Sequence, residues 1–143
     1  MIVLDTNVVS ALMAIELPPA VARWIAAQDP SEFVLTAVTR AEIRYGIARL
    51  RNGRRRERFQ QAAEALFSAQ VGRSLPFDDR AADLYGEIIA RRNADGRPIS
   101  VLDAQIAAIA RAHDAVVATR DTGGFTGTGV AVVNPFESSG LRR

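Results

Sequence analysis

The 143-residue sequence contains no cysteine and no lysine, and its one histidine is His113. Without cysteine, disulfides and thiolate metal sites are excluded. Without lysine, the chain cannot carry the GK[ST] motif of a P-loop. A histidine-based catalytic site would have to use His113, which is expected to lie near the end of an alanine-rich helix, facing its dipole or solvent. Any catalytic chemistry must therefore come from carboxylates.

Long hydrophobic runs are also missing. No apolar stretch approaches the roughly 18–20 residues of a membrane span, and no basic segment precedes the apolar amino terminus. The chain is 48% hydrophobic and 24% charged, which is ordinary globular composition, and its net charge is only +2 although all 18 basic residues are arginine. We therefore expect one cytoplasmic domain over residues 1–143, ending in a polar tail over 134–143.

Short apolar runs alternate with segments of helical periodicity, which is typical of an α/β fold with a mainly parallel sheet. The strands are predicted over 2–4, 33–35, 74–77, 115–118 and 130–133. The helices are predicted over 8–13, from Pro18-Pro19, over 39–50, after Asn52-Gly53, after Asp78-Asp79 and over 101–113. No repeat or linker interrupts this order, so the sequence favours a single compact unit.

Four acidic residues stand where a strand ends or a helix begins, namely Asp5, Glu42, Asp103 and Asp121. Each has a local explanation. Two of them follow Thr39 or Ser100 by three positions, which is the spacing of a capping box at a helix start. The other two fit a helix cap or a turn. Taken singly, none of the four indicates a functional site.

Together, the four acids favour another interpretation. In an open α/β sheet, the strand-to-helix transitions line the crevice at the carboxyl ends of the strands, where ligands usually bind. Carboxylates that meet there raise one another's pKa unless a cation lies between them. Because the chain offers oxygen ligands and no thiolate, we expect Mg²⁺ or Mn²⁺. Thr6, Asn7 and Thr119 are predicted to hydrogen-bond these carboxylates or their waters, although turn chemistry explains them equally well.

A run of arginines surrounds the break after the third predicted helix, in the stretch ARLRNGRRRERF. Such a run can hold the phosphates of a nucleic acid, whose neutralisation makes binding sensitive to salt. It can equally be a solvated face with local ion pairs to Glu57. The candidates for RNA contact are Arg49, Arg51, Arg54, Arg55 and Arg56.

Four motifs, in this order, resemble those of the PIN-domain ribonucleases: LDTNV, TxxExxxG (Thr39, Glu42 and Gly46), DAQIAAIA and ATRDTGGF. The resemblance is to the VapC- and FitB-like toxins of type II toxin–antitoxin pairs, and it spans nearly the whole chain through VAVVNPF. It implies a single PIN domain with a three-layer α/β/α architecture. It also implies a Mg²⁺- or Mn²⁺-dependent endoribonuclease that hydrolyses RNA phosphodiester bonds and leaves 5′-phosphate and 3′-hydroxyl ends.

Carried over position by position, the resemblance assigns catalytic roles to Asp5, Glu42, Asp103 and Asp121. It makes Asp5 and Asp103 direct metal ligands, Asp121 a ligand directly or through water, and Glu42 a residue that acts through water. Many relatives carry a further acid just before the phenylalanine of the fourth motif, where this chain has Gly124. The site is therefore expected to consist of four acids. These acids could hold either one or two metal ions.

The resemblance also implies partners, namely an antitoxin that embraces the early helices, a second copy in a homodimer, and DNA only through the antitoxin. The candidates for the antitoxin face, for which core packing is an equal explanation, are Trp24, Ile25, Tyr45 and Leu50. An alternative from another class is a catalytically silent module whose acidic groove binds a basic peptide. A DNA-processing nuclease is disfavoured, because such PIN relatives carry segments that this chain lacks.

Overall fold

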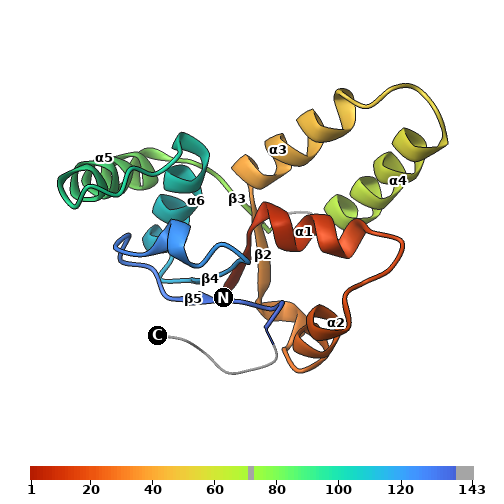
Figure 1. The fold of residues 1–143 in the computed structure, drawn as a ribbon, viewed down its shortest axis with the longest axis horizontal. Helices are drawn as coiled ribbons and strands as arrows, with labels where there is room; N and C mark the ends of the chain where they lie inside the picture. The colour runs from red at the N-terminus through yellow and green to blue at the C-terminus, as the bar shows by residue number, and fades with distance from the viewer. Residues whose placement is uncertain (71–72, 138–143) are drawn as a thin grey trace.

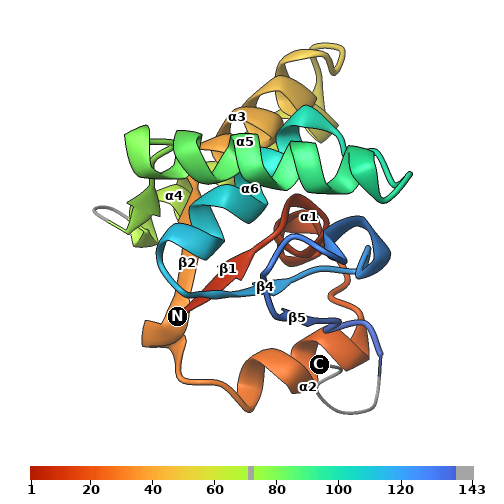
Figure 2. The same cartoon turned by 90° about the vertical axis from the view of Figure 1, so that its left-hand side faces the viewer.

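The computed structural model describes residues 1–70 and 73–137. In this part of the chain, five parallel strands form one sheet in the order β3-β2-β1-β4-β5. The strands are β1 (Ile2–Leu4), β2 (Phe33–Thr36), β3 (Ser74–Leu75), β4 (Val116–Ala118) and β5 (Val132–Val133). The chain adds strands on one side of β1 and then on the other, so the direction of addition reverses between β1 and β4. Figure 2 shows β1, β4 and β5 side by side beneath α5 and α6.

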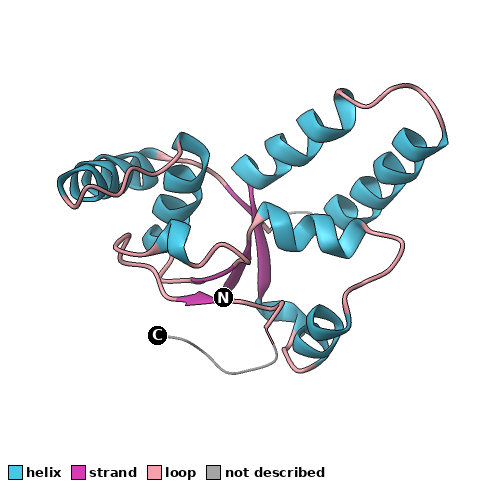
Figure 3. Cartoon of the chain, in the orientation of Figure 1, coloured by secondary structure: helices cyan, strands magenta, loops and turns pink. Residues whose placement is uncertain are grey.

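Helices cover both faces of this sheet (Figures 1 and 3). They are α1 (Thr6–Met13), α2 (Pro19–Ala26), α3 (Ala37–Ala48), α4 (Arg54–Ala69), α5 (Asp79–Ala94) and α6 (Val101–Ala112), with short 3₁₀ turns η1 (Pro30–Glu32) and η2 (Gly123–Phe125). Figure 1 shows α5 and α6 on one side of the strands and α1, α3 and α4 on the other. The expected three-layer α/β/α architecture is thus confirmed. Among the described residues, no helix has the length and apolar character needed to cross a membrane.

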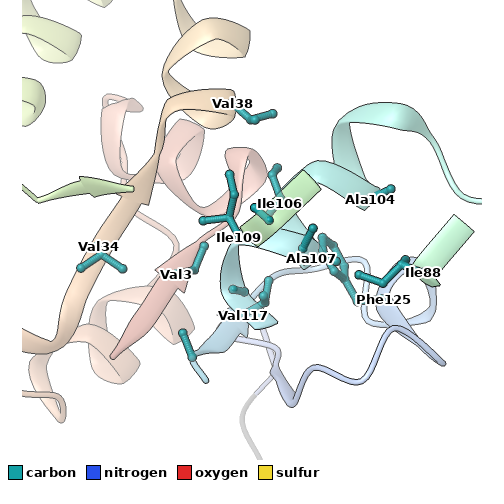
Figure 4. Packing of buried hydrophobic residues seen from close by; sticks show 14 residues of the cluster. Val3, Val34, Val38, Ile88, Ala104, Ile106, Ala107, Ile109, Val117 and Phe125 are labelled. Carbon is teal, nitrogen blue, oxygen red and sulfur yellow. The ribbon is translucent and has the colours of Figure 1, made fainter. Parts of the chain in front are cut away.

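Alternation along the strands divides the buried side chains into two cores. Val3, Val34 and Val117 face α5 and α6, where the alanine and isoleucine side chains of α6 pack against them (Figure 4). Leu4 and Leu35 face the opposite side and pack with α1, α3 and α4. Because neighbouring strand residues point to opposite faces, the central strands β1, β2 and β4 each supply both cores. These three strands are therefore covered on both sides, and their carboxyl ends are fixed in position.

The predicted ends of several elements differ from the structure by one or two residues; α1, for example, begins at Thr6, two residues before the predicted start. Helix α3 begins at Ala37, because Thr36 caps it by accepting a hydrogen bond from the Thr39 amide at 3.0 Å. Strand β3 ends at Leu75, since its partner β2 ends at Thr36 and offers no further backbone to pair with. Strand β5 is also only two residues long and pairs with Val117 and Ala118 of β4.

The first part of the predicted tail belongs to the folded domain. Pro135 is buried, and Phe136 is partly buried and packs against the core that contains Leu4 and Leu35. The Arg120 guanidinium lies 3.8 Å from the centroid of the Phe136 ring, which is a cation–π contact next to the loop that carries Asp121. The rest of the predicted tail, residues 138–143, lies outside the described residues.

Candidate functional site

All four predicted acids meet at the carboxyl edge of the sheet. Asp5 directly follows β1, Asp121 lies in the loop after β4, Glu42 lies on α3 after β2, and Asp103 lies in the first turn of α6. The charges of Asp103 and Asp121 both act on Asp5, and those of Asp5 and Asp103 both act on Glu42. The strands β2, β1 and β4 are adjacent and parallel, so this edge is the crevice in which such sheets bind ligands.

Asp5 is at once a helix cap and the centre of the cluster. Its side chain is buried, and Oδ1 accepts a hydrogen bond from the Thr6 amide at 2.8 Å, which caps α1. Oδ2 accepts from the Thr119 hydroxyl at 2.8 Å and from Nδ2 of Asn7 at 3.3 Å. Its backbone N–H donates to the carbonyl of Ala118 in β4 at 3.0 Å. Asp5 therefore caps α1 and also lies within the acidic cluster, so the two explanations do not exclude each other.

Thr119 and Asn7 join the ends of β1 and β4. The Thr119 hydroxyl donates to Asp5 and accepts from Nδ2 of Asn7 and from the Asp121 amide, both at 3.1 Å. Oδ1 of Asn7 accepts from the Arg120 amide, also at 3.1 Å. Every polar atom of these two side chains thus has a partner near the acids. The structure brings both predicted residues into contact with the carboxylates or with their backbone.

A residue of α1 holds the Glu42 side chain by a hydrogen bond. The Thr6 hydroxyl donates to Oε1 of Glu42 at 2.9 Å, so the third predicted hydrogen-bonding residue also contacts an acid. The capping box predicted for Thr39 and Glu42 is wrong, because Thr36 caps α3 and Thr39 lies inside the helix. A Glu in the second turn has no free amide to satisfy. Its half-buried carboxylate is therefore available to the crevice.

Asp103 is positioned by the start of α6. The Ser100 side chain accepts a hydrogen bond from the Asp103 amide at 3.2 Å, so the predicted serine cap is confirmed. Asp103 is half-buried in the first turn of this helix. The helix dipole favours a negative charge at that position.

Asp121 turns back onto its own loop. Its Oδ1 accepts a hydrogen bond from the Gly124 amide at 3.0 Å. A Cβ atom built on Gly124 would lie 2.5 Å from Oδ2 of Asp121, a distance that requires one of them to move. The missing side chain of Gly124 thus lets Asp121 adopt this orientation.

The Gly124→Ala substitution is expected to displace the Asp121 carboxylate and to lower activity by up to about 100-fold, because small misplacements of catalytic groups have effects of this order. The melting temperature should change little, since the new methyl group meets the end of an exposed side chain and no backbone. Kinetics and thermal melting measure both effects. Gly123→Ala is the matched control, because a Cβ at Gly123 meets no atom within 4 Å. Equal activities of the two variants would contradict the prediction.

Burial and mutual repulsion oppose ionisation of the cluster. Burial is the main cause that raises the pKa of Asp5, Glu42 and Asp103 above their ordinary values, and neighbouring carboxylates raise each of them further. Hydrogen bonds from Thr119, Thr6 and Ser100 act in the opposite direction but do not cancel these effects. None of the ion pairs found within the described residues involves any of the four acids. Within the described residues no salt bridge therefore neutralises these carboxylates, and the one arginine whose charge acts to lower the pKa of Asp103 is Arg92.

This donor set fits a hydrated divalent cation better than a fully protein-caged one. As the side chains stand, no group of three or more acidic or histidine residues within 1–70 and 73–137 is arranged to hold one ion directly. Mg²⁺ usually binds through one or two carboxylates and keeps several waters. Two direct carboxylate ligands, with the other acids acting through water, are compatible with this spacing and with an all-oxygen site.

Thr119→Val is expected to reduce activity by about 10–100-fold, the usual effect of removing a partner of a ligating side chain. Valine keeps the shape but leaves Asp5 without its shortest side-chain hydrogen bond. Stability should fall by about 1–3 kcal/mol, the cost of unpaired buried groups. Thr128→Val is the control, because Thr128 is also buried and its hydroxyl bonds the Phe125 carbonyl at 2.6 Å. Assays of both variants at one temperature below both melting points should separate the loss of activity from the loss of stability. Equal activities of Thr119→Val and Thr128→Val would contradict the role of Thr119.

The arginine run lies at the far end of α3 from the sheet (Figure 1). Arg49 stands seven residues after Glu42, which is about 10 Å along a helix. Arg49 stacks on Tyr45 at 5.8 Å, and Arg55 stacks on Phe59 at 5.7 Å. Arg56 differs, because it donates to the Asn52 side chain at 2.7 Å and so stabilises the α3–α4 turn. Arg51 and Arg54 are exposed.

The four candidates for an antitoxin face lie in different environments. Trp24 and Ile25 on α2 pack partly against the core, and the Trp24 ring lies 5.6 Å from that of Phe33. Tyr45 is 68% exposed, whereas Leu50 is half-buried. A groove of about 200 Å³ lies between α1, α3 and α4, and its lining includes Met13, Ile43, Ile47, Leu50, Phe59, Arg49 and Arg55. It is an apolar groove with a basic rim.

Sequence reasoning missed the roles of two residues that shape the loop after β4, one within the loop and one that bonds it from α5. Gly124 was noted only as a missing acid, and its role depends on a side-chain orientation that spacing does not reveal. Arg92 is 5% exposed and donates to the carbonyls of Gly123 and Thr126. In sequence it is one of two adjacent arginines near a helix end, where exposed arginines are common. No local signal distinguishes it from Arg91.

The parallel sheet with carboxylates gathered at its carboxyl edge defines an α/β domain with an acidic candidate active site. Residues 2–129 match the family model of the PIN domain, and the chain belongs to that family. The matched range extends from β1 to the loop that precedes β5, and it includes all four acids.

The chain is similar to a VapC ribonuclease and to a protein named Toxin FitB. It is 44% identical to VapC ribonuclease Y4jK of Sinorhizobium fredii, with 96% of this chain and 99% of that protein covered. It is 40% identical to Toxin FitB of Neisseria gonorrhoeae, with 95% and 99% covered. Among solved structures, it is similar to FitAB bound to an IR36 DNA fragment, with a TM-score of 0.90, 38% identity and 96% of each chain covered. The resemblance to VapC- and FitB-like toxins is thereby confirmed.

Proposed function

We propose that the protein is a Mg²⁺- or Mn²⁺-dependent endoribonuclease that hydrolyses RNA phosphodiester bonds and acts as the toxin of a toxin–antitoxin pair in the cytoplasm. The observation that carries this proposal is the convergence of Asp5, Glu42, Asp103 and Asp121 at the carboxyl edge of the sheet, without a neutralising ion pair among the described residues. The similarity to a protein named VapC ribonuclease supports the activity.

In this proposal Asp5 and Asp103 hold the cation, Asp121 contacts it directly or through water, and Glu42 acts through water. A bound Mg²⁺ would neutralise the charge of the phosphodiester, lower the pKa of water and stabilise the leaving oxygen. Glu42, with its carboxylate fixed by Thr6, orients the attacking water and accepts its proton. Water as the nucleophile leaves a 5′-phosphate and a 3′-hydroxyl, and the 2′-hydroxyl is not required.

The substrate must approach this acidic crevice across basic surface. We assign RNA contact to Arg49, Arg51, Arg54 and Arg55, and a supporting role in the α3–α4 turn to Arg56, whose guanidinium is already bonded to Asn52. Arg49 lies about 10 Å along the helix from Glu42, a distance that suits contact with a phosphate near the cleaved bond. Such contacts make RNA affinity fall with rising salt.

We also infer an antitoxin partner and a homodimer. The apolar groove between α1, α3 and α4 supports an antitoxin segment with apolar side chains and acidic flanks, because the basic rim at Arg49 and Arg55 would attract acidic residues. The solved FitAB structure, which includes DNA, supports a contact with DNA through the antitoxin. A basic side chain of the partner placed among the four acids would neutralise the site.

The competing proposal is a catalytically silent module whose acidic crevice binds a basic peptide. It shares the geometry and the electrostatics, and it differs in having no need for metal. Raised pKa values of the acids would favour either a cation or a basic side chain between them. Metal-dependent cleavage therefore discriminates between the two.

The deciding experiment incubates the purified chain with total RNA in Mg²⁺, in Mn²⁺ and in EDTA, and maps the ends of the products. The proposal expects cleavage in both metals, none in EDTA, and products with 5′-phosphate ends. Cleavage that persists in EDTA, or products with 2′,3′-cyclic phosphates, would overturn the mechanism. Absence of cleavage with every RNA offered, together with metal-independent binding of basic peptides, would favour the silent module.

A further inference from the structure

Arg92 in the last turn of α5 is a buried cation that forms no salt bridge within the described residues, although its charge acts on Asp103 and acts to lower the pKa of that carboxylate. Its side chain is 5% exposed, and no ion pair within residues 1–70 and 73–137 includes it. Arginine is rarely buried unless its charge is paired. A guanidinium has five N–H donors in a rigid fork, and it stays charged in proteins. Its hydrogen bonds therefore indicate what this buried charge does.

All the hydrogen bonds of the Arg92 guanidinium go to backbone carbonyls of two separate segments. Nε donates to Arg97 at 2.6 Å, and Nη2 donates to Pro98 at 3.4 Å. Nη1 donates to Thr126 at 2.6 Å and to Gly123 at 3.3 Å. The first segment is the α5–α6 turn, and the second is the loop that contains η2.

Each of these segments leads to one of the acids. The α5–α6 turn continues into Ser100, which caps α6 and sets the position of Asp103. The η2 loop begins two residues after Asp121, and its Gly124 amide holds the Asp121 carboxylate. Arg92 is the side chain that bonds both segments at once.

We propose that Arg92 is a positioning residue that fixes Asp103 and Asp121 relative to each other by clamping the α5–α6 turn to the η2 loop. The inference rests on the proposed function, because it takes these two acids as parts of one cation site. Arg92 does not touch the cation or the RNA. Its removal lets two backbone segments move apart and leaves their carbonyls without donors.

The test compares the parent chain with Arg92→Met and Arg92→Lys. Methionine retains much of the aliphatic bulk and removes the donors, whereas lysine keeps the charge but lacks the fork that spans both segments. Arg91→Met is the matched control, because the neighbouring Arg91 side chain is 74% exposed and makes only a 3.9 Å contact with Asp95. Mn²⁺ affinity is measured by electron paramagnetic resonance, and hydrogen–deuterium exchange is measured on peptides that cover 97–103 and 119–128.

Both Arg92 variants are expected to bind Mn²⁺ about tenfold more weakly, the scale of effect seen when partners of ligating groups are removed. Their exchange should accelerate in the two named segments more than elsewhere, while Arg91→Met behaves as the parent does. Parent-like Mn²⁺ affinity, or faster exchange that is uniform over the chain, would overturn the proposal and leave Arg92 a role in stability alone. If Arg92→Met does not fold, Arg92→Lys decides.

The readouts also separate this inference from the proposed function. If the parent chain binds no Mn²⁺, the metal-dependent function fails, and so does the part of the inference that concerns the cation. If the parent binds Mn²⁺ and the Arg92 variants bind it equally well, only the positioning role fails.

Discussion

Replacing Asp103 with asparagine is expected to abolish RNA cleavage while leaving the metal-free fold at least as stable as that of the parent chain. Loss of a direct ligand should lower the rate by at least about 100-fold, the upper end of the effect of removing an outer partner. Stability should hold, because burial and the neighbouring carboxylate of Asp121 raise the pKa of Asp103 and so oppose its charge in the folded state. Asparagine removes that charge and keeps the shape. The Asp103 amide still bonds the Ser100 side chain.

Cleavage rates in Mn²⁺ and melting temperatures in EDTA, measured on the same preparations, check both parts. Asp83→Asn is the control, because Asp83 is an exposed carboxylate on α5 away from the cluster. It should change neither quantity appreciably. Equal cleavage by the parent and Asp103→Asn would assign the activity to a contaminant or to other residues. A large fall in the melting temperature of Asp103→Asn would mean that the carboxylate serves the fold.

The opposite signs of these two effects distinguish a ligand from a structural residue. Removing a buried polar group that serves the fold lowers stability, because its partners lose their hydrogen bonds. Removing one of several mutually repelling carboxylates relieves repulsion, and the activity lost is then not a consequence of unfolding. Sites that keep such strained charges commonly trade stability for function.

Much of the fold and the four acids could be predicted from sequence, because their signals are local. Apolar triplets such as Ile2–Leu4 indicate strands that are buried on both faces, and an acid that directly follows such a strand lies at its carboxyl end. A parallel sheet then brings separate strand ends to one edge. The expectation that the acids lie near one another follows from this topology, and in the structure the charges of Asp103 and Asp121 act on Asp5, and those of Asp5 and Asp103 act on Glu42.

The parts that sequence did not reveal depend on contacts between distant segments. The cap of α3 was placed at Thr39, because the Thr-x-x-Glu spacing also occurs one turn inside a helix, and Thr36 was hidden at the end of a strand. Arg92 takes its role from carbonyls in two loops that only the folded chain brings together. The arginine run looked uniform, yet Arg56 is bonded within the α3–α4 turn while its neighbours are exposed.

The acidic cluster should also make the free energy of unfolding depend on pH. Its contribution should fall as the pH rises without metal, and rise with pH when a divalent cation is bound. The pKa values of Asp5, Glu42 and Asp103 are raised in the folded state, so these three groups bind more protons in the folded chain than in the unfolded chain between about pH 4 and their raised pKa values. Stability from these groups is complete below their unfolded pKa values and is lost as the pH rises through the folded ones. Asp29 and Glu64, whose pKa values are lowered, contribute in the opposite direction.

Comparison with Asp103→Asn removes the contribution of those other acids. In EDTA, the free energy of unfolding of the parent minus that of the variant should fall as the pH rises from 4 to 8. Mn²⁺ should reverse the trend, because the cation binds the ionised carboxylates and competes with protons at low pH. At 100 times its dissociation constant it should stabilise the parent at pH 7 by about 2.7 kcal/mol, and it should have little effect on the variant or at pH 4. Denaturant titrations across this range measure both quantities.

Two outcomes would mean that the cluster is not the cation site. One is a difference in the free energy of unfolding between parent and variant that rises with pH in EDTA. The other is equal stabilisation of both proteins by Mn²⁺.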